Sequence, residues 1–216
     1  LPPLRPDRLR RQHYRLFIDT LRSNMRACGA LRIDHVMGLM RLFWIPGARA
    51  PGDGAYVHYT LDEMLAIVAL ESQRNQCLVI GEDLGTVADE MRHALAACDV
   101  LSYRLLYFER QGSGDFKPVA DYPAAALAAV STHDLATLAG WWAGHDLRLR
   151  LDLGLYPNQD LFEKQLVDRS TDRMRLLLTL RHAGLLDAGQ LAEAAGASGL
   201  SAQIRQAVHC FLAGAP

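Results

Sequence analysis

Three acidic residues stand directly after short apolar segments of the chain: Asp34, Glu82 and Asp134. A short apolar run is typical of a buried parallel strand, and in an α/β barrel the carboxyl ends of such strands surround one mouth. Three carboxyl groups at one mouth repel one another, so we interpret the pattern as a candidate catalytic site. An acid after a strand is also a good N-cap for the next helix, and for each residue taken alone this alternative stays open.

Paired carboxyl groups suit the cleavage of a glycosidic bond. One ionised carboxylate attacks the anomeric carbon, while a protonated partner donates to the leaving oxygen. Arg32 lies two residues before Asp34 in a predicted strand, so we expect both side chains to point to the same side. A cation at that position favours the charged form that a nucleophile needs.

Short apolar strands alternate with amphipathic helices through the first 134 residues, and mostly helical segments follow. Strands are predicted over 30–33, 77–81, 103–108 and 128–131, and loops over 46–59 and 110–122. Helices are predicted over 7–28, 61–75, 87–97, near 123–127, and over 135–150, 159–182, 187–195 and 201–213.

This alternation is typical of a parallel sheet with helices on both faces. No glycine-rich phosphate turn follows the first strand, which disfavours a doubly wound nucleotide-binding sheet. A closed (β/α)8 barrel needs about 250 residues, and this chain has about half of the strands. We therefore predict an α/β fold with one partial barrel domain over 1–216. Its strand–helix units lie in 1–134 and a helical remainder in 135–216.

The composition is that of a globular protein with a sizeable core: half of the 216 residues are hydrophobic. Lys plus Arg is 23 against 24 Asp plus Glu, a balance that argues against a dedicated nucleic-acid binder. No stretch approaches the roughly 18 apolar residues of a membrane span, and the start, which lacks Met, lacks the apolar core of a signal peptide. We expect a cytoplasmic protein without a membrane association.

The four cysteines, Cys28, Cys77, Cys98 and Cys210, are widely scattered and have no histidine at zinc-binding spacing. This pattern predicts free, buried thiols in a reducing compartment. The sequence indicates neither a metal site nor a cofactor.

Four motifs in order resemble the amylomaltases, the 4-α-glucanotransferases of glycoside hydrolase family 77. They are Arg32-Ile33-Asp34-His35 with Gly38-Leu39, then Gly54-Ala55-Tyr56-Val57, Gly81-Glu82-Asp83-Leu84-Gly85, and Thr132-His133-Asp134-Leu135 with Thr137. Trp44-Ile45-Pro46 and 65–74 are also similar to that family, and the likeness runs from about residue 7 to at least residue 182.

The resemblance implies an α-amylase-type barrel of which this chain holds roughly strands four to seven. Asp34 would be the nucleophile on strand four, Glu82 the general acid/base on strand five, and Asp134 the transition-state stabiliser on strand seven. Arg32, His35 and His133 match positions that orient the nucleophile or bind the same sugar. Asp83 is interpreted as a supporting or capping group. No cofactor is implied.

Three aromatic residues, Trp44, Tyr56 and Tyr59, border the loop between the first two motifs and are candidates for stacking on sugar rings. Ordinary packing of the loop against the barrel is the alternative for each. The resemblance implies transfer of α-1,4-glucan segments between maltodextrins or to glucose by a retaining double displacement.

Two alternatives stay open: a hydrolase or branching enzyme of the same superfamily, and an incomplete fragment that at most binds glucan. The family's barrel begins before residue 1 and continues past residue 216. Open barrel edges would leave unpaired strand groups, which favours a homodimer.

Overall fold

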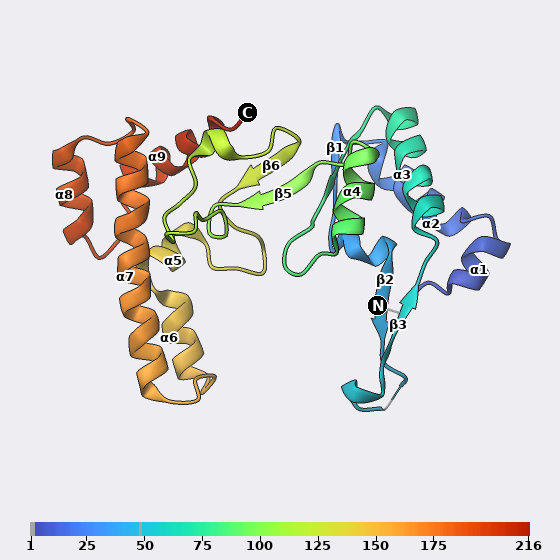
Figure 1. Ribbon diagram of the computed structural model, residues 1–216, viewed down its shortest axis with the longest axis horizontal. Coiled ribbons are helices and arrows are strands. Elements are labelled where there is room, and N and C mark those ends of the chain that lie inside the picture. The colour runs from blue at the N-terminus through green and yellow to red at the C-terminus, as the bar shows by residue number, and fades with distance from the viewer. Residues whose placement is uncertain (1–2, 48) are drawn as a thin grey trace. The chain divides into compact units, whose positions relative to one another are not determined.

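The computed structural model describes residues 3–47 and 49–216 (Figure 1). Residues 1–2 of the predicted domain and residue 48 of the predicted 46–59 loop lie outside the described residues. The chain divides into two compact units, 1–103 with 125–127, and 104–124 with 128–216. Within the described residues, no helix combines the length and apolar character needed to cross a bilayer.

The first unit contains a parallel strand pair, an antiparallel hairpin and four helices among its described residues. Its elements are α1 (Pro6–Arg11), α2 (Arg15–Met25), β1 (Ala30–Ile33), β2 (Arg41–Trp44), β3 (Ala55–His58), α3 (Leu61–Asn75), β4 (Leu78–Gly81) and α4 (Asp89–Ala97), with 3-10 turns at Val36–Leu39 and Pro51–Asp53. The helices α2, α3 and α4 gather beside β1 and β4, whereas the hairpin β2–β3 extends away from them (Figure 1).

The strands β1 and β4 pair in parallel, with Ala30 opposite Leu78 and Ile33 opposite Gly81. Residues from β4 and the surrounding helices and turns form one apolar cluster around this pair, in which Met25, Val36 and Met91 are completely buried. Burial of each such side chain contributes about 1.5–3 kcal/mol relative to exposure. This cluster fixes the two strands on which the first two acids depend.

The antiparallel hairpin pairs Arg41 with His58 and Trp44 with Ala55. Residues 55–58 lie in the stretch predicted as a loop over 46–59, so that prediction is wrong for them. These residues form a strand because they pair with β2. The sequence pattern did not predict β2 as a strand either. A separate two-stranded sheet therefore follows β1.

The strands β5 (Ser102–Leu105) and β6 (Ala126–Ala129) also pair. The backbone N–H of Ser102 donates to Ala125 O and that of Leu106 to Ala129 O, so the bonds advance in the same direction along both strands. The predicted helix near 123–127 is therefore wrong. Helix propensity of the alanines is overridden there by pairing with β5.

The second unit is mostly helical, as predicted for the C-terminal part. Its helices are α5 (Leu138–Ala143), α6 (His145–Asp152), α7 (Gln159–His182), α8 (Ala188–Gly196) and α9 (Ala202–Ala213), with a 3-10 turn at Val119–Asp121. The long helix α7 runs beside α6 along one half and beside α8 along the other (Figure 1). Trp142, Leu176, Leu180 and Val208 lie in its buried apolar cluster.

Two predicted helices are each divided in the structure. The segment 7–28 forms α1 and α2, because His13 and Tyr14 adopt left-handed backbone angles between them, with φ of 50° and 56°. The Tyr14 hydroxyl donates to Glu63 of α3, so a contact between helices stabilises the break. The segment 135–150 forms α5 and α6, which are separated by Gly144 at a φ of 68°.

Candidate active site

Asp34 and Glu82 leave the same edge of the β1–β4 pair. Ile33 and Gly81 are Cα partners at the ends of the two strands, and these acids are the next residues. The backbone pairing continues past the strands, since Glu82 N–H donates to Ile33 O at 2.9 Å and Val36 N–H donates to Glu82 O at 3.1 Å. Backbone hydrogen bonds thus hold the segment around Asp34 against Glu82, independently of any side-chain contact.

The carboxylate of Glu82 is held by two backbone N–H groups. His35 N–H donates to Oε2 and Leu84 N–H to Oε1, each at 2.9 Å. His35 adopts a left-handed conformation with φ 47° and ψ 59°, which costs an L-residue about 1 kcal/mol. This turn directs the N–H of the residue after Asp34 toward Glu82. We call the arrangement of His35, Leu84 and Glu82 the carboxylate clasp.

Asp34 is paired with Arg32, as the spacing predicts. The guanidinium Nη2 lies 2.8 Å from Asp34 Oδ1, and the two side chains are 26% and 60% exposed. The Arg32 guanidinium also lies over the ring of Tyr103, with its Cζ 5.1 Å from the ring centroid. Arg32 is therefore held on one side by an aromatic face while it presents a positive charge to Asp34.

Asp83 is buried and acts as a support, which agrees with its interpretation from sequence. Its side chain accepts Tyr103 N–H at Oδ1 and Arg92 Nη1 at Oδ2, both at 2.9 Å. Asp83 therefore ties α4 to the start of β5, where Tyr103 lies under Arg32. Sequence reasoning missed Tyr103 and Arg92, since an aromatic residue in an apolar run and an arginine on a helix carry no signal of their own.

The hairpin presents an exposed aromatic pair. Tyr56 and Phe43 are cross-strand partners, 57% and 46% exposed, with ring centroids 5.1 Å apart in an edge-to-face arrangement. Arg41 lies over the Tyr56 ring at 4.5 Å. Sequence reasoning missed Phe43, although the alternation of β2 would place it on the same face as Arg41. Tyr56 thus has the exposure that contact with a ligand requires.

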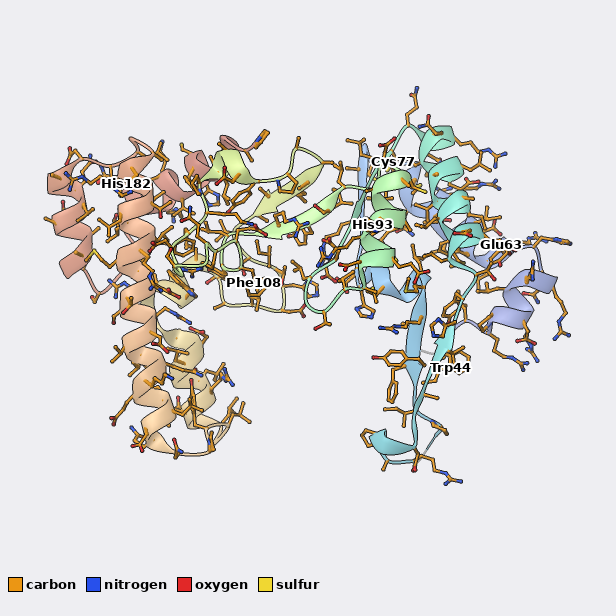
Figure 2. All side chains as sticks on the ribbon, in the orientation of Figure 1. Trp44, Glu63, Cys77, His93, Phe108 and His182 are labelled. Atoms are coloured by element: carbon orange, nitrogen blue, oxygen red, sulfur yellow. The ribbon has the colours of Figure 1, made fainter. Side chains whose placement is uncertain are left out.

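Trp44 and Tyr59 are half-buried. Trp44 lies on the hairpin opposite Ala55 (Figure 2). Tyr59 packs against the apolar cluster of the first unit, and its hydroxyl donates to Leu4 O at 2.8 Å. Burial raises the pKa of the Tyr59 hydroxyl. These contacts favour the packing alternative for Tyr59.

Asp134 lies in the second unit, in an exposed turn after β6. Its carboxylate is 3.3 Å from His133 Nε2, and its own N–H donates to Thr132 Oγ1 at 3.2 Å. Ser131 Oγ donates to Ala136 O at 2.9 Å and closes the same turn. The structure thus brings Asp34, Glu82, Arg32 and His35 together in one unit, and Asp134 with His133 in the other. Among the residues that the structure describes, no group of three or more metal-binding side chains is gathered.

Comparison with known proteins gives one consistent result. The family model described as 4-alpha-glucanotransferase, glycoside hydrolase family 77, matches residues 1–213. A 4-alpha-glucanotransferase of Haemophilus influenzae is 46% identical over 186 residues, which cover 86% of this chain and 26% of that protein. A 4-alpha-glucanotransferase of Mycobacterium bovis is 42% identical over 192 residues, with 87% and 26% covered.

Among solved structures, the amylomaltase of Corynebacterium glutamicum matches 98% of this chain and 30% of its own, with 31% identity and a TM-score of 0.87. The chain therefore has the α/β fold of part of an amylomaltase. It spans about a quarter of the length of the curated relatives named above.

Proposed function

Because this chain belongs to the 4-alpha-glucanotransferase family, glycoside hydrolase family 77, we propose that it supplies the catalytic carboxyl groups of an enzyme that transfers α-1,4-glucan segments. The donors would be maltodextrins, and the acceptors maltodextrins or glucose. The carboxylate clasp is the observation that carries the proposal. It places Glu82 against the backbone of the residue next to Asp34.

In the proposed mechanism Asp34 attacks the anomeric carbon and forms a covalent glucosyl intermediate. Glu82 protonates the leaving oxygen and then takes the proton from the incoming hydroxyl. A retaining reaction of this kind requires carboxyl groups about 5–5.5 Å apart. The ion pair with Arg32 supports the role of Asp34, since the guanidinium lies beside the attacking carboxyl group and helps to hold it in place.

Glu82 needs a change of hydrogen bonding to act as an acid. In the structure both of its oxygens accept backbone N–H groups, as an ionised carboxylate does. A protonated carboxyl can keep one N–H on its carbonyl oxygen while the other oxygen gives its proton to the leaving group. We propose that substrate entry releases one of these two N–H groups.

The remaining site residues complete the proposal. Asp134 would stabilise the oxocarbenium-like transition state, with His133 beside it on the same sugar. The strands β1, β4 and β6 would be the fourth, fifth and seventh of a (β/α)8 barrel. The steps use carboxyl chemistry alone and call for no cofactor. Cytoplasmic location and a homodimer through open barrel edges stay predictions from the sequence.

Tyr56 is the strongest candidate for an acceptor or donor subsite. Its exposed ring and that of Phe43 present the apolar surface on which a glucose face stacks. Tyr56→Ala should therefore raise the KM for long maltodextrins about 10-fold while kcat changes little, a loss of about 1.4 kcal/mol. Trp44 would support this subsite as part of the hairpin. Tyr59 would support it by packing against the apolar cluster of the first unit.

The test uses maltotriose and two proteins. One is this chain alone, and the other is a chimera in which it replaces the matching part of the Haemophilus influenzae relative. Products resolved by chain length should show glucose together with maltopentaose and longer chains, without a rise in total reducing ends. A rise in reducing ends would indicate hydrolysis instead. Activity of the chimera alone would show that the chain is competent but incomplete.

Variants of the chimera assign the roles. Asp34→Asn should lower transfer on the order of 10⁴-fold or more, and Glu82→Gln about 10²–10⁴-fold, since both act in the chemical step. Asp168→Asn is the matched control, because Asp168 is exposed on α7. Transfer within a few-fold of wild type in Asp34→Asn or Glu82→Gln would refute the assignment.

A further inference from the structure

Two of the four cysteines lie in contact at the amino ends of the paired strands. Cys28 stands two residues before β1, Cys77 stands one residue before β4, and their Sγ atoms are 3.7 Å apart. Figure 2 labels Cys77 at the start of β4. The sequence predicts four buried thiols, but Cys28 and Cys210 are exposed and only Cys77 is buried. The prediction of burial is therefore wrong for Cys28, which lies in an exposed turn before β1, and for Cys210, which lies on the exposed side of α9.

The backbone around the two thiols is fixed by the same pairing that holds the active-site acids. Leu78 N–H donates to Gly29 O at 2.9 Å, which joins the residue after Cys77 to the residue after Cys28, and Ser72 Oγ donates to Cys77 O at 2.7 Å. A disulfide bond is about 2.05 Å long, so the sulfur atoms must approach by about 1.6 Å. Rotation of the exposed Cys28 side chain can supply part of this movement without a change in the strands.

We propose that Cys28 and Cys77 form an oxidisable dithiol, a modification site at which a small-molecule disulfide cross-links the amino ends of β1 and β4. The Cys28 thiolate attacks one sulfur of the small disulfide, and one small thiolate leaves. The Cys77 thiolate then attacks Sγ of Cys28, forms the protein disulfide and releases the second small thiolate. Two protein thiols are oxidised, one small disulfide is reduced to two thiols, and the two protons pass to them.

The order of the two steps follows from exposure. Cys28 is exposed and meets the small disulfide first. Cys77 is only 2% exposed, and burial raises the pKa of its thiol, with a further contribution from the neighbouring Cys28. Cys77 therefore reacts with a small disulfide in solution less readily than Cys28 does, and it acts as the resolving thiol in the second step.

The consequence concerns the register of the two strands. The cross-link would lie at the opposite ends of β1 and β4 from Asp34 and Glu82. It would hold Ala30 opposite Leu78 even when the hydrogen bonds between the strands open. The modification would therefore slow opening of the strand pair without touching the carboxyl groups. This inference does not depend on the proposed function.

The experiment titrates this 216-residue chain with oxidised and reduced glutathione, followed by alkylation of the free thiols. The count of free thiols should fall from four to two, with a loss of two hydrogen masses in the monomer. Trypsin cuts after arginine, so the cross-linked product should join peptide 27–32 to peptide 75–92. The amide protons of β1 should exchange at least about tenfold more slowly in the oxidised chain.

Two variants and one condition serve as controls. The double variant Cys98→Ser/Cys210→Ser should form the same cross-link, and Cys28→Ser should form none. In concentrated urea the thiols have only the roughly millimolar effective concentration of a flexible tether, so cross-linking should be at least about tenfold less complete. Four free thiols throughout, a different pairing, glutathione retained on Cys28, or equal cross-linking in urea would each overturn the proposal.

Discussion

Replacing Asp83 by asparagine tests how the candidate nucleophile is positioned. Asp83 is 3% exposed and accepts one bond from Tyr103 N–H and a charge-assisted bond from Arg92. Asparagine keeps an oxygen for Tyr103 N–H but loses the negative charge that faces Arg92. A hydrogen bond to a charged group contributes about 1.5–3 kcal/mol. Asp83→Asn should therefore lower the free energy of local unfolding around Tyr103 by that amount.

This loss of local stability can be measured as hydrogen exchange at one backbone amide, that of Tyr103. A cost of about 1.5–3 kcal/mol corresponds to roughly 10- to 150-fold faster hydrogen exchange of Tyr103 N–H, measured by NMR on the whole chain. Asp83→Ala removes both bonds and leaves Tyr103 N–H without this acceptor. It should cost about 1–3 kcal/mol more than Asp83→Asn. Exchange of Tyr103 N–H should therefore be fastest in Asp83→Ala, slower in Asp83→Asn and slowest in the wild type.

The matched control is Asp99→Asn. Asp99 is exposed and has a left-handed φ of 53°, a conformation that asparagine tolerates, so exchange at Tyr103 should not change. Exchange within twofold of wild type in Asp83→Asn, or equal rates in the asparagine and alanine variants, would refute the reasoning. In the chimera, Asp83→Asn should lower kcat more than it alters KM, because Tyr103 carries Arg32 beside Asp34.

Three further predictions concern pH and redox state. Hydrogen bonds from Arg22 lower the pKa of Glu71, so the stability that this carboxylate adds is present above its unfolded-state pKa and is lost as the pH falls through the folded-state value. The difference in Tm between wild type and Glu71→Gln should shrink below about pH 4, and a constant difference would refute this. Burial raises the pKa of Tyr122 to about 12, so its neutral form stabilises the fold below its unfolded-state pKa, an effect lost as the pH rises through about 12. Its hydroxyl has no hydrogen-bond partner among the described residues, so Tyr122→Phe should keep its neutral Tm and unfold at a higher pH in an alkaline titration. A disulfide between Cys28 and Cys77, 49 positions apart, should add about 4 kcal/mol by the chain-entropy relation, measured by urea unfolding of the oxidised and reduced chain; equal midpoints would contradict it.

The strands that carry Asp34 and Glu82 could be predicted because short apolar runs depend on local composition. The segments 30–33 and 77–81 became β1 and β4, and the ion pair of Arg32 with Asp34 follows from alternation along a strand. These features need only the next few residues of the chain. The structure shows them almost as predicted.

The supporting contacts could not be predicted, since they join residues that are distant in the sequence. The break at Tyr14 depends on a contact with Glu63, and no glycine or proline marks it. The strand β6 depends on pairing with β5, whereas its alanines alone favour a helix. Tyr103 beneath Arg32 likewise requires the fold. Tertiary contacts decided each of these positions.

The hairpin after β1 has an implication for how much change in length the chain can accept at this point. Trp44 and Ala55 are cross-strand partners, so a segment between them begins and ends about 5 Å apart. A segment of different length could replace the one between Trp44 and Ala55 without moving β1 or β4. The hairpin can therefore accept a different connecting segment while the strands that carry Asp34 and Glu82 keep their pairing.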